Sequence, residues 1–479
     1  MSVERQFSRG VAWMAVGNWI EQGVNFAVFV TLARLLGARD YGLLSMASVF
    51  VVLSESLVRE SLSEYLIAHE DPGPGDLDAT FWLLAGLGAI LALGLAGLAP
   101  LFARAYGQAE VAPLILALAP SVLIVALNAV PVALLRRRLE FRILSLRAIA
   151  GVVLGGAVGI GMALKGYGVW SFVGQWLVLI ATNAVMAWTA VDWRPGRACS
   201  RGEVGRAAHF GAQVLGLRAG ELAATQVPLL LIGATLGPVA TGLFSVAWRL
   251  VETLSFLIVT PLRQASQSAF AALGRQGNGA AGVLLADITR LTGLVAVPFF
   301  AGLALLAAPM ILLILGAEWR AAAPVLQVMA LMGIYICLNR LQMAFCLAAG
   351  RAGAISALTW VVVGLAAVLI WAVSAQGIVA VAAALVAAHY LLWPAYFAIV
   401  ARIAGRPALG FVTCHILPCL GALVMALPVW WCVRAMGDAR PLFILALAVP
   451  VGIAIYLTFS LALMRDRFAL LFALVRGRT

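Results

Sequence analysis

The chain is poor in charged residues and contains a single lysine, Lys165. Only 11% of its 479 residues are charged, whereas soluble domains carry about 25%. Its hydrophobic content of 64% and mean hydropathy of +1.04 exceed what a soluble core can bury. The composition therefore excludes a soluble protein and predicts an all-α protein that crosses a membrane many times.

The sequence also lacks the usual motifs of enzymes and metalloproteins. The six cysteines form no CxxC pair, and no Walker A, HExxH or GxSxG motif occurs. We therefore predict no catalytic residue, no metal site and no cofactor, and we expect that the protein is not an enzyme. The predicted loops are too short to hold an ATPase, a glycosyltransferase or a nucleic-acid-binding domain, so ATP hydrolysis by this chain is not expected.

The basic residues are nearly all arginine, and the formal net charge is +12. A bilayer core of ~30 Å needs about 20 apolar residues per helix. By that measure the chain contains about fourteen spans, from 11–33 to 441–464. Placing both termini in the cytoplasm puts most of the loop arginines, including the run at 136–138, on the cytoplasmic side, as the positive-inside rule requires.

An internal repeat organises these spans. The segment LGARDYGLLS at 36–45 is matched without a gap by LGPVATGLFS at 236–245, and 106–120 resembles 315–331. Two bundles of six helices in the same orientation follow, with a site expected between them. We predict an N-terminal bundle over 1–205 and a second over 206–406, followed by two additional helices and a cytoplasmic tail over 407–479.

Charged side chains occur inside the predicted spans, where each costs roughly 2.5–3.5 kcal/mol at the bilayer centre. Helical spacing lets Glu55 share a face with Arg59, and likewise Arg218 with Glu221 and Arg249 with Glu252. Arg340 has no local partner. Two interpretations are open: the pairs are neutral struts between helices, or the arginines bind an anionic head group bidentately. The candidate substrate-binding residues are Arg59, Arg218, Arg249 and Arg340.

A second set of polar residues is a candidate for coupling transport to protons or sodium, or for lining a cavity. Glu21 and Glu221 are repeat mates, and Gln22 and Asn25 share a helix face with Glu21. The set consists of Glu21, Gln22, Asn25, Glu55, Glu221 and Glu252. The glycines Gly151, Gly155 and Gly159 form overlapping GxxxG steps, which predict close helix packing.

Residues 8–45, and the stretch LGAEWRAAAPVLQVMAL at 315–331, resemble the polysaccharide repeat-unit (Wzx-type) flippases of the multidrug/oligosaccharidyl-lipid/polysaccharide exporter superfamily. The resemblance implies two six-helix bundles around a cationic cavity, plus two peripheral helices, in the bacterial inner membrane. It also implies that a polyprenyl-diphosphate-linked oligosaccharide is moved outward by alternating access, for exopolysaccharide, capsule or O-antigen synthesis.

Membrane lipids are expected partners of this flippase, a polymerase and a chain-length regulator are candidate partners, and nucleic acid is not expected. We expect a monomer. Two alternatives from the same superfamily stay open: a cation-coupled multidrug antiporter, which would use acids such as Glu21 and Glu55, and a lipid II flippase. Drug sensitivity and essentiality for growth would distinguish them.

Overall fold

The computed structural model describes residues 3–61, 66, 73–196, 200–274, 278–437 and 439–464. Within these residues the secondary structure is helical, with no strand. Twelve helices of the described chain are long and apolar enough to cross a membrane. The protein is therefore an all-α, multi-pass membrane protein, as the composition predicts.

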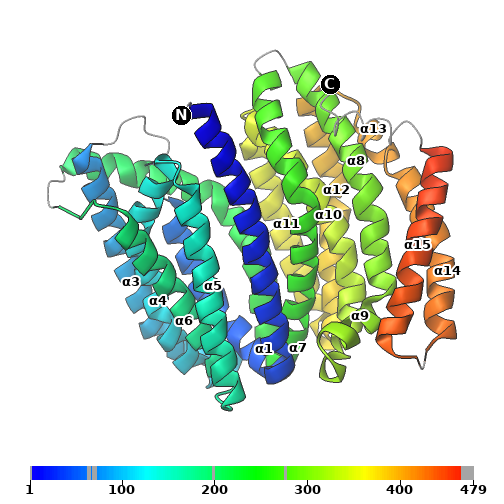
Figure 1. Cartoon of the computed structure of the whole chain (residues 1–479), viewed down its shortest axis with the longest axis horizontal. Coiled ribbons are helices and arrows are strands. Elements are labelled where there is room, and N and C mark those ends of the chain that lie inside the picture. Colours follow the sequence, from blue (N-terminus) through cyan, green and yellow to red (C-terminus); the bar gives the residue numbers. More distant parts are fainter. Residues whose placement is uncertain are drawn as a thin grey trace. The chain divides into compact units, whose positions relative to one another are not determined.

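The chain divides into two compact units, residues 1–242 (unit 1) and 243–479 (unit 2). The division falls inside α7, so it tests neither the predicted boundary at 205/206 nor the one at 406/407, which stay predictions. Unit 1 contains α1 (Val3–Ser61), α3 (Pro74–Tyr106), α4 (Val111–Arg137), α5 (Phe141–Leu164), α6 (Trp170–Ala190) and the first part of α7 (Arg201–Gly274) (Figure 1).

Unit 2 contains the rest of α7 and the helices that follow it. These are α8 (Asn278–Leu305), α9 (Ala307–Ile314), α10 (Ala322–Ala348), α11 (Ala352–Val373), α12 (Ile378–Ala404), α13 (Ala408–Thr413), α14 (Ile416–Ala435) and α15 (Pro441–Leu463), with short 3₁₀ turns at Ala317–Trp319 and Ser374–Gln376. The two helices predicted to follow the repeat correspond to α14 and α15, which pack on each other, and α14 also packs on α8.

Two of the twelve long helices contain a break at equivalent glycines of the repeat. Gly37 interrupts α1 with φ 71° and ψ 177°, and Gly237 interrupts α7 with φ 77° and ψ −172°. Only glycine adopts this backbone conformation without steric strain. Each apolar stretch, 17–59 and 219–260, is about twice as long as one crossing needs. The sequence predicts short loops at these positions, between the spans 11–33 and 41–66 and between the spans 208–233 and 240–262. The total of fourteen spans stays a prediction.

The segments that follow these two breaks cross at two further glycines, all within unit 1. A Cβ atom on Gly42 would lie 1.7 Å from the carbonyl oxygen of Pro238, and one on Gly242 would lie 2.0 Å from that of Ala38. Ala38 and Pro238 are themselves 200 positions apart, so the contact is reciprocal between the repeats. Backbone approaches this close are possible only where side chains are missing.

Glycines also permit the packing of α5 on α6, as the GxxxG spacing predicts. A Cβ atom would lie 2.7 Å from the backbone oxygen of Gln175 if built on Gly155, and 3.0 Å from that of Leu179 if built on Gly151. The main core of unit 1 lies among α1, α3 and α4, where Phe50 stacks on Phe102 with ring centroids 3.8 Å apart. This packing fixes the helix ends that carry the polar residues described below.

Candidate functional site

Basic side chains from three helices of unit 1 gather at one end of its bundle. Arg59 lies in the last turn of α1, Arg136 in the last turn of α4, and Arg147 in the second turn of α5. Arg147 is half-buried and lies within electrostatic range of both other arginines and of Glu21. We call Arg59, Arg136 and Arg147 the arginine cluster.

Glu55 anchors the cluster to the interior of unit 1. Its Oε1 accepts hydrogen bonds from Ser121 Oγ at 2.6 Å and from Trp176 Nε1 at 3.2 Å, while Oε2 lies 3.7 Å from Arg59 Nη2. The Glu55 side chain is 4% exposed and that of Arg59 is 61% exposed. The predicted Glu55–Arg59 pair is thus confirmed, but it joins a buried acid to an accessible guanidinium that keeps most of its donors available.

The polar face predicted for the first span lies on α1. Glu21, Gln22 and Asn25 are all half-buried, and Glu21 is close enough to Arg147 for their charges to interact. The positive charge that acts on Glu21 therefore comes from α5, which is far away in the sequence. This placement brings Glu21 together with the arginine cluster.

In unit 2 the acid–base pairing differs from the one that helical spacing predicts. Glu252 Oε1 lies 3.3 Å from Arg340 Nη2, which joins α7 to α10, and Glu252 makes no ion pair with Arg249. The expectation that Arg249 pairs with Glu252 was therefore wrong, because a helix neighbour in space competes with one in sequence. Arg340, for which the sequence offers no local partner, has a distant one in Glu252. Arg249 is exposed and has no ion pair among the residues that the structure describes.

Asn339, the residue next to Arg340, links α10 to α12. Asn339 donates a hydrogen bond to the hydroxyl of Tyr335 and accepts one from Tyr396 Oη at 3.2 Å. Tyr396 belongs to α12, so α10 is linked to α12 by Asn339 and to α7 by Arg340.

The remaining predicted pair is Arg218 and Glu221. Glu221 is half-buried on α7, whereas the side chain of Arg218 lies outside the described residues.

Arg136 and Arg147 were not predicted as site residues. Both belong to the arginine-rich connection between the fourth and fifth spans, which the positive-inside rule explains as a topology anchor. The structure begins α5 at Phe141, so Arg147 lies inside the helix and not in a loop. The position of Arg147, six residues after the start of α5, is the feature that distinguishes it from a loop arginine. Among the described residues no group of three or more His, Cys, Asp or Glu side chains could hold a metal.

Comparison with known proteins places these features in a family. A family model described as "Polysaccharide biosynthesis protein" matches residues 31–324. The succinoglycan biosynthesis transport protein ExoT of Rhizobium meliloti is 24% identical over 68% of this chain and 65% of its own length. The teichuronic acid biosynthesis protein TuaB of Bacillus subtilis is 23% identical over 73% of each chain. The chain thus aligns with just under two thirds of ExoT.

Solved structures agree on the fold. The lipid II flippase MurJ superposes with a TM-score of 0.75 at 14% identity, covering 95% of this chain and 99% of MurJ. A multidrug resistance MATE transporter superposes with a TM-score of 0.57 at 17% identity, covering 85% and 96%. At such identities the likeness concerns the fold alone. The family model, in contrast, covers more than half of the sequence, and the chain belongs to the polysaccharide biosynthesis protein family.

Proposed function

We propose that the protein is a flippase that moves a polyprenyl-diphosphate-linked oligosaccharide across the bacterial inner membrane for polysaccharide synthesis. The observation that carries this proposal is the arginine cluster of unit 1. Three guanidinium groups converge there, whereas Glu55 and Glu21 are the acids beside them. Among the described side chains, these three cations and two anions sum to a positive charge, which suits an anionic group such as a diphosphate.

The chemistry of the cluster favours a diphosphate over an organic cation. Arginine remains charged at any physiological pH and presents a fork of donors that matches two phosphate oxygens. The acids are less available, because Glu55 is buried and already accepts two hydrogen bonds through Oε1. A multidrug antiporter would need accessible carboxylates instead. The names of the polysaccharide relatives, which include transport and lipopolysaccharide biosynthesis proteins, support the same substrate class.

Arg249 of unit 2 is a second candidate contact for the substrate. It is exposed on α7 and has no ion pair within the described chain, whereas Arg340 is neutralised by Glu252. We therefore assign substrate binding to Arg59, Arg136, Arg147 and Arg249, and a positioning role to Arg340. Proton or sodium coupling through Glu21, Glu55 or Glu221 is part of this proposal.

The test is the sidedness of the lipid-linked oligosaccharide in a deletion strain. Inverted inner-membrane vesicles are probed with an impermeant glycosidase, which reaches only the cytoplasmic face. Repeat units should accumulate on that face, and re-expression should clear them. The variants Arg59→Gln and Arg147→Gln should be produced at normal levels and should fail to clear the repeat units. Arg104→Gln is the matched control, because Arg104 is exposed and lies in the last turn of α3, near the start of α4 and away from the cluster. Outer-face repeat units in the deletion strain would refute the proposal.

A further inference from the structure

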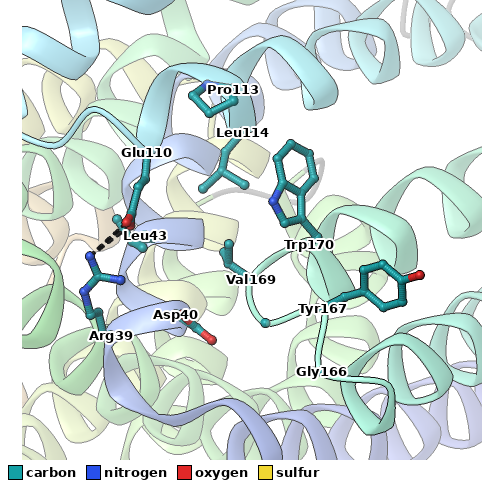
Figure 2. A pocket seen from close by; sticks show the side chains of 11 residues that line it. Arg39, Asp40, Leu43, Glu110, Pro113, Leu114, Gly166, Tyr167, Val169 and Trp170 are labelled. Atoms are coloured by element: carbon teal, nitrogen blue, oxygen red, sulfur yellow. Dashed lines mark hydrogen bonds and ion pairs between the residues drawn. The ribbon is translucent and has the colours of Figure 1, made fainter.

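A pocket of about 320 Å³ lies in unit 1 (Figure 2). Its lining includes the start of α4, whereas the arginine cluster lies at the end of that helix. The walls of the pocket come from α1 just after the break at Gly37, from the start of α4, and from the turn between α5 and α6. Helix α4 begins at this pocket and ends at the cluster, so its 27 residues separate the two sites by about 40 Å. The volume lies near the lower limit of ~300–1,000 Å³ for small-ligand sites.

One wall of the pocket carries a charged pair. Arg39 Nη2 lies 3.0 Å from Glu110 Oε2 and 3.1 Å from Oε1, joining α1 to the residue that precedes α4. Both side chains are more than half exposed, so each keeps free donors or acceptors toward the pocket. Figure 2 shows the two residues facing each other at one side of the pocket.

Asp40 adds a carboxylate that is not used elsewhere. It is half-buried, and it has neither a hydrogen-bond nor an ion-pair partner among the residues that the structure describes. The turn beside it is built around glycine, since Gly168 has φ +55° and a Cβ there would lie 3.4 Å from Asp40 Oδ2. Asp40 and the α5–α6 connection are therefore neighbours in the lining of the pocket.

Two aromatic side chains complete the opposite side. Trp170 is 41% exposed and Tyr167 is 56% exposed, and neither the indole N–H nor the phenol has a hydrogen-bond partner within the described chain. In Figure 2, Val169 lies between Trp170 and the Arg39–Glu110 pair, and the Tyr167 ring points away from that pair. Backbone hydrogen bonds from Tyr167 to Met162 (3.2 Å) and from Trp170 to Tyr167 (3.2 Å) hold the turn that carries both rings.

This combination selects a class of ligand. An anionic phosphate would meet two carboxylates and one guanidinium that is already paired, and a purely apolar ligand would leave Asp40 desolvated. A pyranose satisfies both requirements: its hydroxyls donate to the carboxylates and accept from Arg39, and its C–H face packs on an aromatic ring. We propose that this pocket binds one neutral pyranose ring of the translocated saccharide; the identity of that saccharide rests on the proposed function.

The position of the pocket gives it a role distinct from that of the arginine cluster. The predicted topology puts the break at Gly37 and the α5–α6 turn on the outer face, and the arginine-rich α4–α5 connection in the cytoplasm. A sugar site at the outer end would hold the saccharide after crossing, about one membrane thickness away from the site proposed for the diphosphate.

The experiment measures glycoside binding to the full chain in lipid nanodiscs by saturation-transfer NMR. The probes are the methyl glycosides of glucose, galactose, mannose and N-acetylglucosamine, with tetramethylammonium as a cation probe. At least one glycoside should bind. Trp170→Ala should weaken that binding by on the order of tenfold, and Asp40→Asn, which keeps the shape of the side chain, should weaken it as well. Trp371→Ala removes an exposed tryptophan from the end of α11 and should have no effect.

Three results would overturn the pocket assignment. These are no binding of any of the four glycosides to the wild type, equal losses from the Trp170 and Trp371 variants, or binding of tetramethylammonium in place of the glycosides. The vesicle test separates this inference from the proposed function. Glycoside binding without translocation refutes the flippase and leaves the pocket standing, whereas translocation without glycoside binding refutes the pocket alone.

Discussion

The reciprocal crossing at Gly42 and Gly242 makes a quantitative prediction for Gly42→Ala. A Cβ atom at position 42 would lie 1.7 Å from the Pro238 oxygen, and real Cβ atoms essentially never approach closer than 3.0 Å. The two segments must therefore separate by at least the difference of 1.3 Å. Overpacking of this kind costs about 1–3 kcal/mol or more, and the gain in helix propensity from alanine is at most about 1 kcal/mol.

We expect a net loss of roughly 2 kcal/mol in the free energy of unfolding, measured as a lower midpoint of thermal unfolding in detergent. Gly94→Ala in α3 is the matched control, because a Cβ there meets nothing within 4 Å. It should leave the midpoint unchanged or raise it. An equal effect of the two substitutions would refute the close crossing.

The double variant Gly42→Ala/Gly242→Ala tests whether both glycines serve the same contact. A Cβ at position 242 requires a separation of at least 1.0 Å, from 2.0 Å to 3.0 Å, and the Gly42 substitution already provides a separation of that size. The combined loss should therefore be smaller than the sum of the two single losses, as expected for residues in direct contact. Additive losses would show that the two glycines act independently and would contradict the reciprocal geometry.

Three further substitutions follow from the described contacts. Ser121→Ala removes the 2.6 Å hydrogen bond to buried Glu55 and should cost about 1–3 kcal/mol of stability. Ser48→Ala, which removes a hydroxyl that donates to the backbone oxygen of Ser45, is the control. Glu252→Gln and Arg340→Gln should each lower the free energy of unfolding. A double-mutant cycle should give a coupling energy of roughly 0.5–1 kcal/mol, because both side chains are partly exposed. A coupling energy of zero would contradict the ion pair. Gly155→Ala should lower the thermal midpoint more than Gly161→Ala, since only position 155 faces the α6 backbone, and equal effects would refute that packing.

The fold could be predicted from the sequence further than the site could. Apolar length and the repeat at 36–45 and 236–245 suffice for a polytopic helical protein with breaks near Gly37 and Gly237, because both signals are local. Ion pairing within one helix was predicted correctly for Glu55 and Arg59, which are four residues apart. Pairing between helices was not predictable: Glu252 and Arg340 are 88 positions apart, and only packing decides which basic residue reaches the acid.

The charges in unit 1 support the proposal that the arginine cluster binds a ligand. Arg136 and Arg59 both repel Arg147, and Glu21 offsets only part of that repulsion. Glu55 compensates weakly, since its contact with Arg59 is long at 3.7 Å and its other oxygen is committed to Ser121 and Trp176. Because the Arg59 side chain is 61% exposed and the contact is long, solvent screens this pair and its contribution to stability is small. Under the proposed function, a diphosphate that displaces Glu55 from Arg59 would break only this weak contact and would leave the two hydrogen bonds of the acid intact.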